Sequence, residues 1–365
     1  MARLSITLFT AALIASSPAC AADPLAELRL SQVQVIGTHN SYHLAPDVVA
    51  AKFLQAVVPG EATANDYSHA PLVEQLQRLG VRQLELDLFL DPEGQLYHDP
   101  AFLQAAREQQ TQVPPHDPEG LLKKPGIKIL HSPDFDFRTT VYTFAAALRQ
   151  IKGWSDEHRE HSPLFLLLEL KSESFSPRTR PPAWNATALD MLETEILASL
   201  PRERILTPSD IQGAHPTLRE AILRDGWPTM RQARGKVILL LDNEDAVRDA
   251  YQQTKPMRND RLLFVTVARE HPDAAWMKRN DVVGSFREIQ ELVKTGFLVR
   301  TRADSGTREA RRNDVATRDK AFASGAQLIS TDFPEVDNRF PDYAVRFEQG
   351  AMVRKNVFAP DDLGQ

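Results

Sequence analysis

The chain has 365 residues and carries 43 Lys and Arg against 49 Asp and Glu, which gives a formal net charge of −6. This negative balance, without a basic cluster, argues against nucleic acid as the partner. The length allows two average domains or one large barrel. After the N-terminal segment, no apolar stretch approaches the roughly 18 residues that a membrane-spanning helix requires.

The N-terminus has the pattern of a secretory signal over residues 1–21. Arg3 supplies the positive start, an apolar core follows, and residues 19–21, Ala-Cys-Ala, resemble a small-residue cleavage site. We therefore expect a secreted or periplasmic protein whose mature chain begins near Ala22. Because Cys20 is the single cysteine, the mature chain would have no thiol, and any metal must be held by oxygen or nitrogen.

Eight apolar runs have the length and composition of strands. They are residues 32–37, 82–88, 127–130, 164–170, 236–241, 261–267, 297–300 and 327–330. Helical periodicity occupies most of the intervals, over residues 72–79, 141–151, 186–200, 217–224, 286–293 and 314–323. Strands that alternate with helices predict a parallel sheet, and eight strands are the number that closes a barrel.

This order of elements favours an α/β fold with a single (β/α)8 TIM-like barrel. A doubly wound open sheet is the alternative, but such a sheet normally has a glycine-rich phosphate loop after its first strand, and this chain has none. Polar residues instead follow several different strands, which is where barrels of this kind assemble their sites. We expect residues 22–365 to form one domain with its core at about 32–334.

Polar side chains gather at the ends of three of the predicted strands. His39 and Asn40 follow the first strand, and strict alternation places Glu85 and Asp87 on one face of the second. Glu169 closes the fourth strand in the same way. An unpaired interior carboxylate costs roughly several kcal/mol, so three acids on two strand ends favour a bound cation.

The candidate metal ligands are the oxygen atoms of Asn40, Glu85, Asp87 and Glu169, completed by water and substrate. Calcium or magnesium suits such a set, since calcium takes about 6 to 8 oxygens, whereas zinc would take the histidines as ligands. A hard cation would polarise a phosphoryl oxygen and acidify a coordinated hydroxyl, as phosphodiester cleavage needs. Lys171, on the face of Glu169, adds a positive charge for phosphate; a lysine that reaches the barrel rim is the alternative.

Histidines are the candidates for the two proton transfers of such a cleavage, one taking a proton and one giving it. His39 is the first, and His98, after the turn that follows the second strand, is the second. His131 follows the third apolar run with Asp134 and Asp136 nearby, and hydrogen bonding within its loop is the simpler account of it. Four further charged residues follow later strands without a catalytic role that the sequence assigns: Arg300, Arg302, Asp304 and Asp332.

Seven segments then match a known family in the same order along the chain. They are Gly37-Thr-His-Asn-Ser-Tyr42, Arg82-Gln-Leu-Glu-Leu-Asp87, Tyr97-His98, Lys128-Ile-Leu-His-Ser-Pro-Asp134, Leu168-Glu-Leu-Lys171, Val299-Arg-Thr-Arg-Ala-Asp304 and Ser330-Thr-Asp-Phe-Pro334. Together they resemble the secreted bacterial calcium-dependent phosphoinositide phospholipase C family, within the wider group of PLC-like barrel phosphodiesterases. The resemblance runs from about Gln32 to Pro334, and several motifs in order are far more specific than one.

The resemblance implies a distorted (β/α)8 barrel that cleaves a phosphodiester by attack of a neighbouring hydroxyl, giving a cyclic phosphate and an alcohol such as diacylglycerol. It implies calcium as the cofactor, with magnesium less favoured, and a phosphoinositide or related phosphodiester as the substrate. A membrane surface is one place where the protein would meet such a substrate. His39 and His98 match the catalytic histidines, with His131 as the substitute for the second. Asn40, the two acids of the second strand and Glu169 match the calcium ligands, and this acidic set argues against the metal-free relatives.

Two other functions stay open from the sequence. A glycerophosphodiester phosphodiesterase could use the same constellation, and its product differs because internal attack on inositol leaves a cyclic inositol phosphate. A barrel that binds phosphorylated headgroups without turnover is a different class of protein. Two proton carriers argue against that class, since a binding protein has no need for them.

Overall fold

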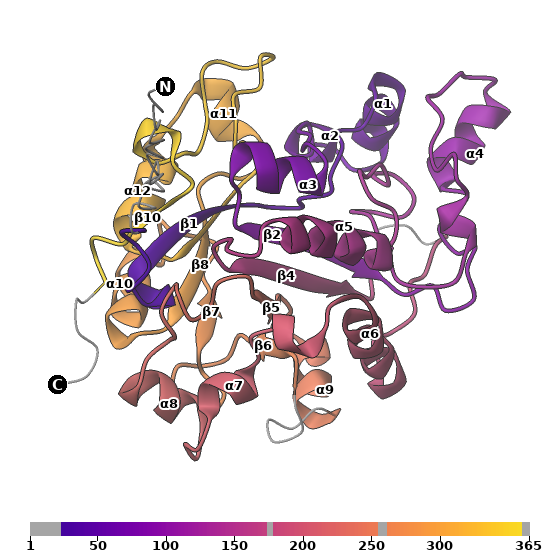
Figure 1. Cartoon of the computed structure of the whole chain (residues 1–365). Coiled ribbons are helices and arrows are strands. Elements are labelled where there is room, and N and C mark those ends of the chain that lie inside the picture. The colour runs from indigo at the N-terminus through magenta and orange to yellow at the C-terminus, as the bar shows by residue number, and fades with distance from the viewer. Residues whose placement is uncertain (1–22, 174–177, 255–260, 360–365) are drawn as a thin grey trace, which may run out of the picture.

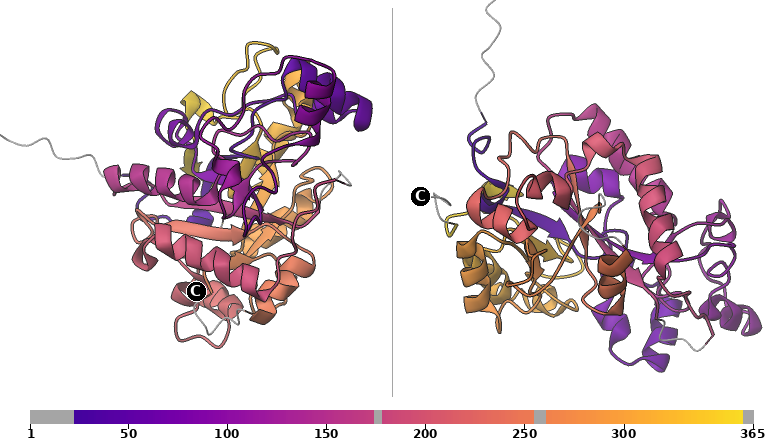
Figure 2. Two further views of the ribbon diagram at one scale, coloured as in Figure 1. Left: turned by 90° about the vertical axis from the view of Figure 1, so that its right-hand side faces the viewer. Right: turned by 90° about the horizontal axis from the view of Figure 1, so that it is seen from below.

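The computed structural model describes residues 23–173, 178–254 and 261–359. The predicted signal segment, residues 1–21, therefore lies outside the described residues. Eight parallel strands form one sheet in the order β6-β5-β4-β2-β1-β9-β8-β7. A parallel bridge between Thr266 and Trp276 joins the two ends of this order, so the barrel is nearly closed. Helices surround the strands (Figures 1 and 2), and the predicted α/β barrel is confirmed.

The barrel strands are β1 (Val33–Thr38), β2 (Gln83–Phe89), β4 (Leu164–Lys171), β5 (Val237–Leu241), β6 (Leu263–Val265), β7 (Trp276–Lys278), β8 (Leu298–Arg302) and β9 (Leu328–Thr331). Two short strands pair antiparallel with this sheet, β3 (Lys128–Ile129) with β2 and β10 (Val353–Lys355) with β1.

The helices are α1 (Val48–Val57), α2 (Glu61–Ala64), α3 (Leu72–Glu74), α4 (Ala101–Glu108), α5 (Phe144–Glu157), α6 (Ala186–Ser199), α7 (Pro208–Gln212), α8 (Leu218–Arg224), α9 (Ala246–Thr254), α10 (Phe286–Thr295), α11 (Arg308–Arg312) and α12 (Ala316–Ser324). A π-helical turn, η2 (Gln75–Leu79), continues α3. Short 3-10 turns are η1 (Leu30–Gln32), η3 (Leu121–Lys123), η4 (Arg202–Arg204) and η6 (Glu348–Gly350).

One of the eight predicted strands does not belong to the barrel. Residues 127–130 contain β3, which pairs antiparallel with the end of β2. The eighth barrel strand is β7, between β6 and β8, and it has three residues. Such a short strand leaves too little alternation for a pattern in the sequence, whereas the run at 127–130 is apolar because it packs over the end of β2.

Apolar composition and helix caps explain the regular elements. β4 and β5 are rich in leucine because strands of a parallel barrel are buried on both faces. Asn185 caps α6 by accepting the Ala188 N–H at 3.0 Å, and the Thr143 side chain caps α5 through the Ala146 N–H. One hydrophobic cluster runs through the barrel and the inner faces of its helices.

β1 and β2 approach each other closely at Gly37, which pairs with Gln83. A Cβ atom at Gly37 would lie 2.1 Å from Oε1 and 2.5 Å from Cβ of Gln83. Glycine is therefore required here by space, and the close approach brings the end of β1, with His39, beside β2.

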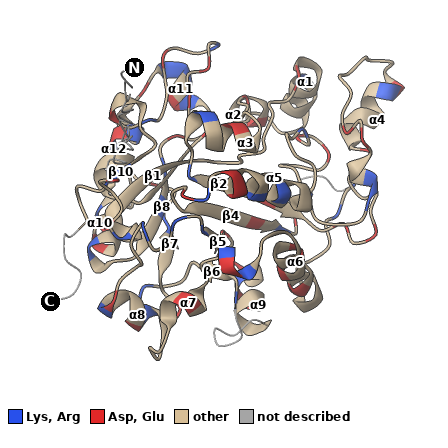
Figure 3. Cartoon of the chain, in the orientation of Figure 1, with Lys and Arg blue, Asp and Glu red and all other residues tan. Residues whose placement is uncertain are grey.

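The exterior carries charges of both signs. Basic and acidic residues occur along the outer helices, as Figure 3 shows for α5 and α12. Within the described ranges, every helix is too short or too polar to cross a bilayer.

Candidate active site

Two neighbouring strands bring three acidic side chains together. β2 and β4 are parallel, and their register pairs Asp87 with Glu169. One carboxylate oxygen from each of Glu85, Asp87 and Glu169 lies within 4.8 Å of the others. Glu85 and Asp87 are buried, so the repulsion among these groups is poorly screened. The arrangement favours a cation among the three carboxylates.

The loop after β1 is tied to β2 beside these acids. The Ser41 N–H donates to the Glu85 carbonyl at 2.9 Å, and the Glu85 N–H donates to the Ser41 hydroxyl at 2.8 Å. Asn40, between this serine and His39, has a left-handed backbone with φ of 45°, which asparagine tolerates better than most residues. Its amide nitrogen donates to the Tyr67 hydroxyl at 3.2 Å, which leaves its carbonyl oxygen to face other groups.

The oxygen atoms of this region are suited to a calcium ion. Oδ1 of Asp87 and Oδ1 of Asn40 have no hydrogen-bond partner among the described residues, and Oδ2 of Asp87 lies 3.2 Å from Nζ of Lys171. Buried polar atoms without partners are rare in folded proteins. Carboxylate and amide oxygens are the ligands that calcium prefers, so the residues present fit the ion that the sequence predicts.

Burial and mutual repulsion change the protonation of the acids. Burial raises the pKa of Glu85 to about 8, although the Arg300 guanidinium, which donates to this carboxylate, opposes the rise. Burial and then the charge of Asp87 raise the pKa of Glu169. Both shifts express the cost of holding several negative charges together, and a bound cation would reduce that cost.

Lys171 lies among the same acids. Its Nζ is 2.8 Å from Oε1 of Glu169 and 3.2 Å from Oδ2 of Asp87. Burial lowers the pKa of Lys171, but the charges of Asp87 and Glu169 outweigh it, and the pKa stands above its ordinary value. Lys171 is therefore charged, and it also lines the pocket described below.

His39 is held between a carboxylate and an arginine. Its Nδ1 is 2.8 Å from Oδ1 of Asp332, and its Nε2 is 3.1 Å from an Arg302 nitrogen and 3.8 Å from Oε1 of Glu85. Because Asp332 accepts a hydrogen bond, Nδ1 carries the proton and Nε2 presents a lone pair. Burial and the charge of Arg302 lower the pKa of His39 well below its ordinary value, against Asp332, which raises it.

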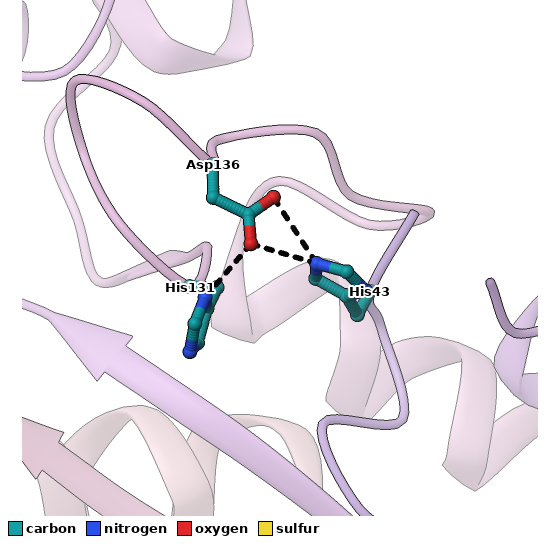
Figure 4. Close-up of side chains that lie close together, drawn as sticks. All are labelled: His43, His131 and Asp136. Atoms are coloured by element: carbon teal, nitrogen blue, oxygen red, sulfur yellow. Dashed lines mark hydrogen bonds and ion pairs between the residues drawn. The ribbon is translucent and has the colours of Figure 1, made fainter. Parts of the chain in front are cut away.

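His131 has a carboxylate partner of its own. Its Nδ1 is 2.8 Å from Oδ2 of Asp136, and its other ring nitrogen points away from this carboxylate (Figure 4). Burial lowers the pKa of His131, but the hydrogen bond to Asp136 and its charge outweigh burial and raise it. Asp134, which the sequence placed beside His131, instead accepts hydrogen bonds from Thr179 and from the Ala101 N–H.

His98 lies apart from these groups. Its Nδ1 pairs with the carbonyl of Gln95 in the same turn. Among the described residues, His98 belongs neither to the group of Glu85, Asp87 and Glu169 nor to the residues that line the pocket beside this group. Among the sequence candidates, the structure thus groups Glu85, Asp87, Glu169 and Lys171, and it leaves His98 outside.

A pocket of about 370 Å³ opens beside the acids. His131, Glu169 and Lys171 line it, together with residues that follow β3, β4 and β5, among them Asn243 and Asp245. It lies at the carboxyl ends of the barrel strands, where barrel enzymes bind their substrates. The pocket therefore gives a substrate access to one histidine, one acid and one lysine of the group.

Several polar residues of this region had no role from the sequence. Asp332, which follows β9, and Arg302, at the end of β8, contact His39, and Asp136 contacts His131. The positions of Asp332 and Arg302 at strand ends were visible, but a charged residue there can equally belong to an ion pair. A signal was available for Asp136 alone, since it follows His131 within one short loop.

Comparison with known proteins identifies the family. Residues 28–357 match the family model of the Ca2+-dependent phosphoinositide phospholipase C. No curated protein matches the chain.

Solved structures share the fold. A calcium-dependent phosphoinositol-specific phospholipase C from Pseudomonas sp, apo form, is 16% identical, with 91% of this chain and 97% of that chain covered and a TM-score of 0.56. The same kind of enzyme from Pseudomonas sp as a myoinositol complex is 15% identical, with 91% and 97% covered and a TM-score of 0.53. A Ca2+-dependent phosphatidylinositol-specific phospholipase C from Streptomyces antibioticus is 15% identical, with 84% and 96% covered and a TM-score of 0.50.

The family match extends over most of the chain, and the acids and histidines described above lie within it. The chain therefore belongs to the Ca2+-dependent phosphoinositide phospholipase C family and is a phosphodiesterase.

Proposed function

We propose that the protein cleaves a phosphatidylinositol-type phosphodiester through attack by a neighbouring inositol hydroxyl, which gives a cyclic inositol phosphate and diacylglycerol. The observation that carries the proposal is a matched pair of histidines beside an acidic cluster. His39 and His131 each donate Nδ1–H to a buried carboxylate, Asp332 and Asp136. Nε2 is therefore the ring nitrogen that would exchange a proton with the substrate. In His39 this nitrogen would exchange its contact with Arg302, at 3.1 Å, for the substrate.

Asn40, Glu85, Asp87 and Glu169 would hold the calcium ion. When bound, the ion supplies Lewis-acid polarisation of a phosphoryl oxygen and lowers the pKa of a nearby hydroxyl. The unpartnered Oδ1 atoms of Asn40 and Asp87 support this ligand set. Lys171 would add a positive charge toward the phosphate from the wall of the pocket.

The histidines divide the proton work. Nε2 of His39 accepts the proton of the attacking hydroxyl, and the new P–O bond forms as the bond to the glycerol oxygen breaks. His131, as an imidazolium, gives its Nε2 proton to that leaving oxygen. The raised pKa of His131 supports the acid role, because an acid must be protonated when the substrate binds. His98 was the sequence candidate for this role, and its position makes His131 the better choice.

Calcium dependence and product identity test the proposal. Phosphatidylinositol in mixed micelles should be cleaved with calcium and not with excess chelator, and phosphorus NMR should show cyclic inositol phosphate as the first product. Equal rates in both buffers would remove calcium from the mechanism. Glycerol phosphate released from glycerophosphodiesters, without any cyclic product, would instead favour a glycerophosphodiester phosphodiesterase.

We also propose that the chain is exported and that residues 22–365 form one mature domain, as the pattern of residues 1–21 predicts. N-terminal sequencing of protein from the periplasm or the medium tests this. A first residue near Ala22 is expected, and a retained Met1 would contradict it.

A further inference from the structure

A third histidine, His43, lies behind His131 and takes no part in the proton transfers proposed above. Its side chain is fully buried, at 0% exposure. Its ring centroid is 4.6 Å from that of Tyr67 and 5.7 Å from that of His131, which it meets edge to face. Figure 4 shows His43 and His131 on two sides of Asp136. A side chain in this position acts on a substrate through its neighbours.

Both ring nitrogens of His43 face hydrogen-bond acceptors. Nδ1 is 3.1 Å from the carbonyl oxygen of Tyr67. Nε2 is 2.9 Å from Oδ2 and 3.1 Å from Oδ1 of Asp136. A carbonyl oxygen has no proton to donate, and an ionised carboxylate has none either. Hydrogen bonds to both acceptors need a hydrogen on each nitrogen, which is the arrangement of an imidazolium.

The environment of Asp136 supports the ionised carboxylate that this assignment needs. Oδ2 accepts from both His43 and His131, and Oδ1 also faces His43. Burial raises the pKa of Asp136, but the two histidines outweigh burial and hold it well below its usual range. Paired backbone hydrogen bonds with Ser132, of 2.8 and 3.2 Å, also hold the Asp136 backbone in place.

We infer that His43 is a positioning residue for His131: as a buried imidazolium it neutralises Asp136 and orients its carboxylate, which keeps a proton on Nδ1 of His131. The inference rests on the proposed role of His131 in proton transfer. Without the charge of His43, Asp136 would depend on His131 alone for compensation and could rotate away from it. With His43 in place, Nε2 of His131 can gain and lose its proton while Nδ1 stays protonated.

A metal ion is the competing account of the same three residues. Two histidine nitrogens and one carboxylate within 4.8 Å are a donor set that zinc accepts. Zinc would need lone pairs on the ring nitrogens that face Asp136. Both oxygens of Asp136 instead accept hydrogen bonds from these histidine nitrogens. This favours protons on the nitrogens over a metal ion.

Nitrogen NMR of the wild-type protein in calcium buffer, with labelled histidine, tests the inference directly. We expect both ring nitrogens of His43 to carry protons and His131 to carry one on Nδ1. An unprotonated nitrogen on His43 would overturn the inference. This measurement needs neither a variant nor turnover, so its outcome is independent of whether the proposed reaction is right.

His43→Gln keeps a donor toward Asp136 and removes the charge. We expect kcat to fall about 10- to 100-fold with little change in KM, as for removal of a residue that orients a reacting group. The matched control is His161→Gln, which removes another buried histidine and should leave kcat unchanged. A kcat within twofold of wild type for a folded His43→Gln protein would contradict the inference.

A double-mutant cycle separates a positioning role from a structural one. In the His131→Ala background, His43→Gln should have little further effect on kcat, because His43 acts through His131. Multiplied losses would show that the two act independently. If His131→Ala alone retained full turnover, the proposed function would fail instead. Loss of activity on removal of zinc in excess calcium would assign the cluster to a metal.

Discussion

Asp87 on β2 and Glu169 on β4 are paired in the parallel register of the two strands, and one ammonium, that of Lys171, lies within 3.2 Å of both. Paired positions of parallel strands present their side chains on one face, so the strand register alone brings these two acids together. The barrel thereby builds a concentrated negative charge that a divalent cation can occupy.

Removing one charge of this pair should weaken calcium binding. Glu169→Gln keeps the size of the side chain and loses a charged oxygen ligand, and we expect at least a tenfold weaker Kd, a loss of about 1.4 kcal/mol. Calorimetric titration with calcium measures it. Glu160→Gln, at a side chain that is 84% exposed, is the matched control and should bind as wild type does. Equal affinities for both variants would exclude Glu169 from the site.

Two variants distinguish His131 from His98 as the general acid of the proposed reaction. His131→Ala should lower kcat by about 10²- to 10⁴-fold, the usual contribution of a general acid or base. His98→Ala should retain most of the activity, because His98 pairs within its own turn. Steady-state kinetics with phosphatidylinositol decide between them. The reverse ranking would return the role to His98.

Asp332 would hold the tautomer that His39 needs in its proposed role as a base. Asp332→Asn can donate to Nδ1 and would then favour the tautomer with a proton on Nε2, so we expect kcat to fall by about 10²- to 10⁴-fold with a smaller change in KM. Asp337→Asn, next in the same segment and paired with exposed Arg339, serves as control. Melting curves for both variants exclude unfolding as the cause. Unchanged kcat in a folded Asp332→Asn protein would argue against this role.

We expect the buried His161 to lower the free energy of unfolding in mild acid. Burial lowers its pKa to about 4 from an ordinary 6.5, although the hydrogen bond to the Ser162 carbonyl opposes the shift. Between these values the unfolded chain binds a proton that the folded chain does not, so the free energy of unfolding falls as the pH falls through this window. The loss reaches up to about 3 kcal/mol and is absent above pH 6.5.

Urea unfolding at several pH values measures this dependence. His161→Gln should have a flatter profile between pH 6.5 and 4 than wild type, because the titrating group is gone. His69, whose burial also lowers its pKa to about 4, remains in both proteins, so their difference isolates His161. Parallel profiles for wild type and variant would refute the prediction.

The close approach of β1 and β2 predicts a stability difference between two glycines. Gly37→Ala would place its Cβ 2.1 Å from Gln83 and should destabilise the fold by about 1–3 kcal/mol. Gly153→Ala, in α5 with open space around its Cβ, should stabilise it by about 0.5–1 kcal/mol. Chemical denaturation measures both, and a neutral Gly37→Ala would show that the strands can separate without cost.

The main features of the barrel could be read from patterns that are local in the sequence. Long leucine-rich runs such as Leu164–Lys171 are unmistakable because both faces are buried. β7 was not predicted, because a strand of three residues is too short to show a periodic pattern. Residues 127–130 were wrongly assigned to the barrel, because an apolar run has the same pattern whether it pairs inside a barrel or at its edge. Helix α1 was not predicted, because it lies within the long connection that follows β1.

For the site, the acids were predictable and their partners were not. Alternation places Glu85 and Asp87 on one face of a strand whatever surrounds it. The choice between His98 and His131 depends on where two loops run after β2 and β3, and no local pattern encodes that. Asp332 pairs with His39 across 293 positions of the chain, a contact that exists because β9 and β1 are neighbours.

By itself, the sequence determined the class of fold and placed His39, Glu85, Asp87 and Glu169 at strand ends, because strand periodicity depends on residues a few positions apart. The tertiary structure decided which carboxylate each histidine faces, which ring nitrogen faces it, and that His43 and His131 lie on two sides of Asp136. Those properties depend on strand order and on the dense packing of loops, which join residues far apart in the chain. The hydrogen-bond partners of a histidine set its tautomer and its charge, so these properties depend on the fold.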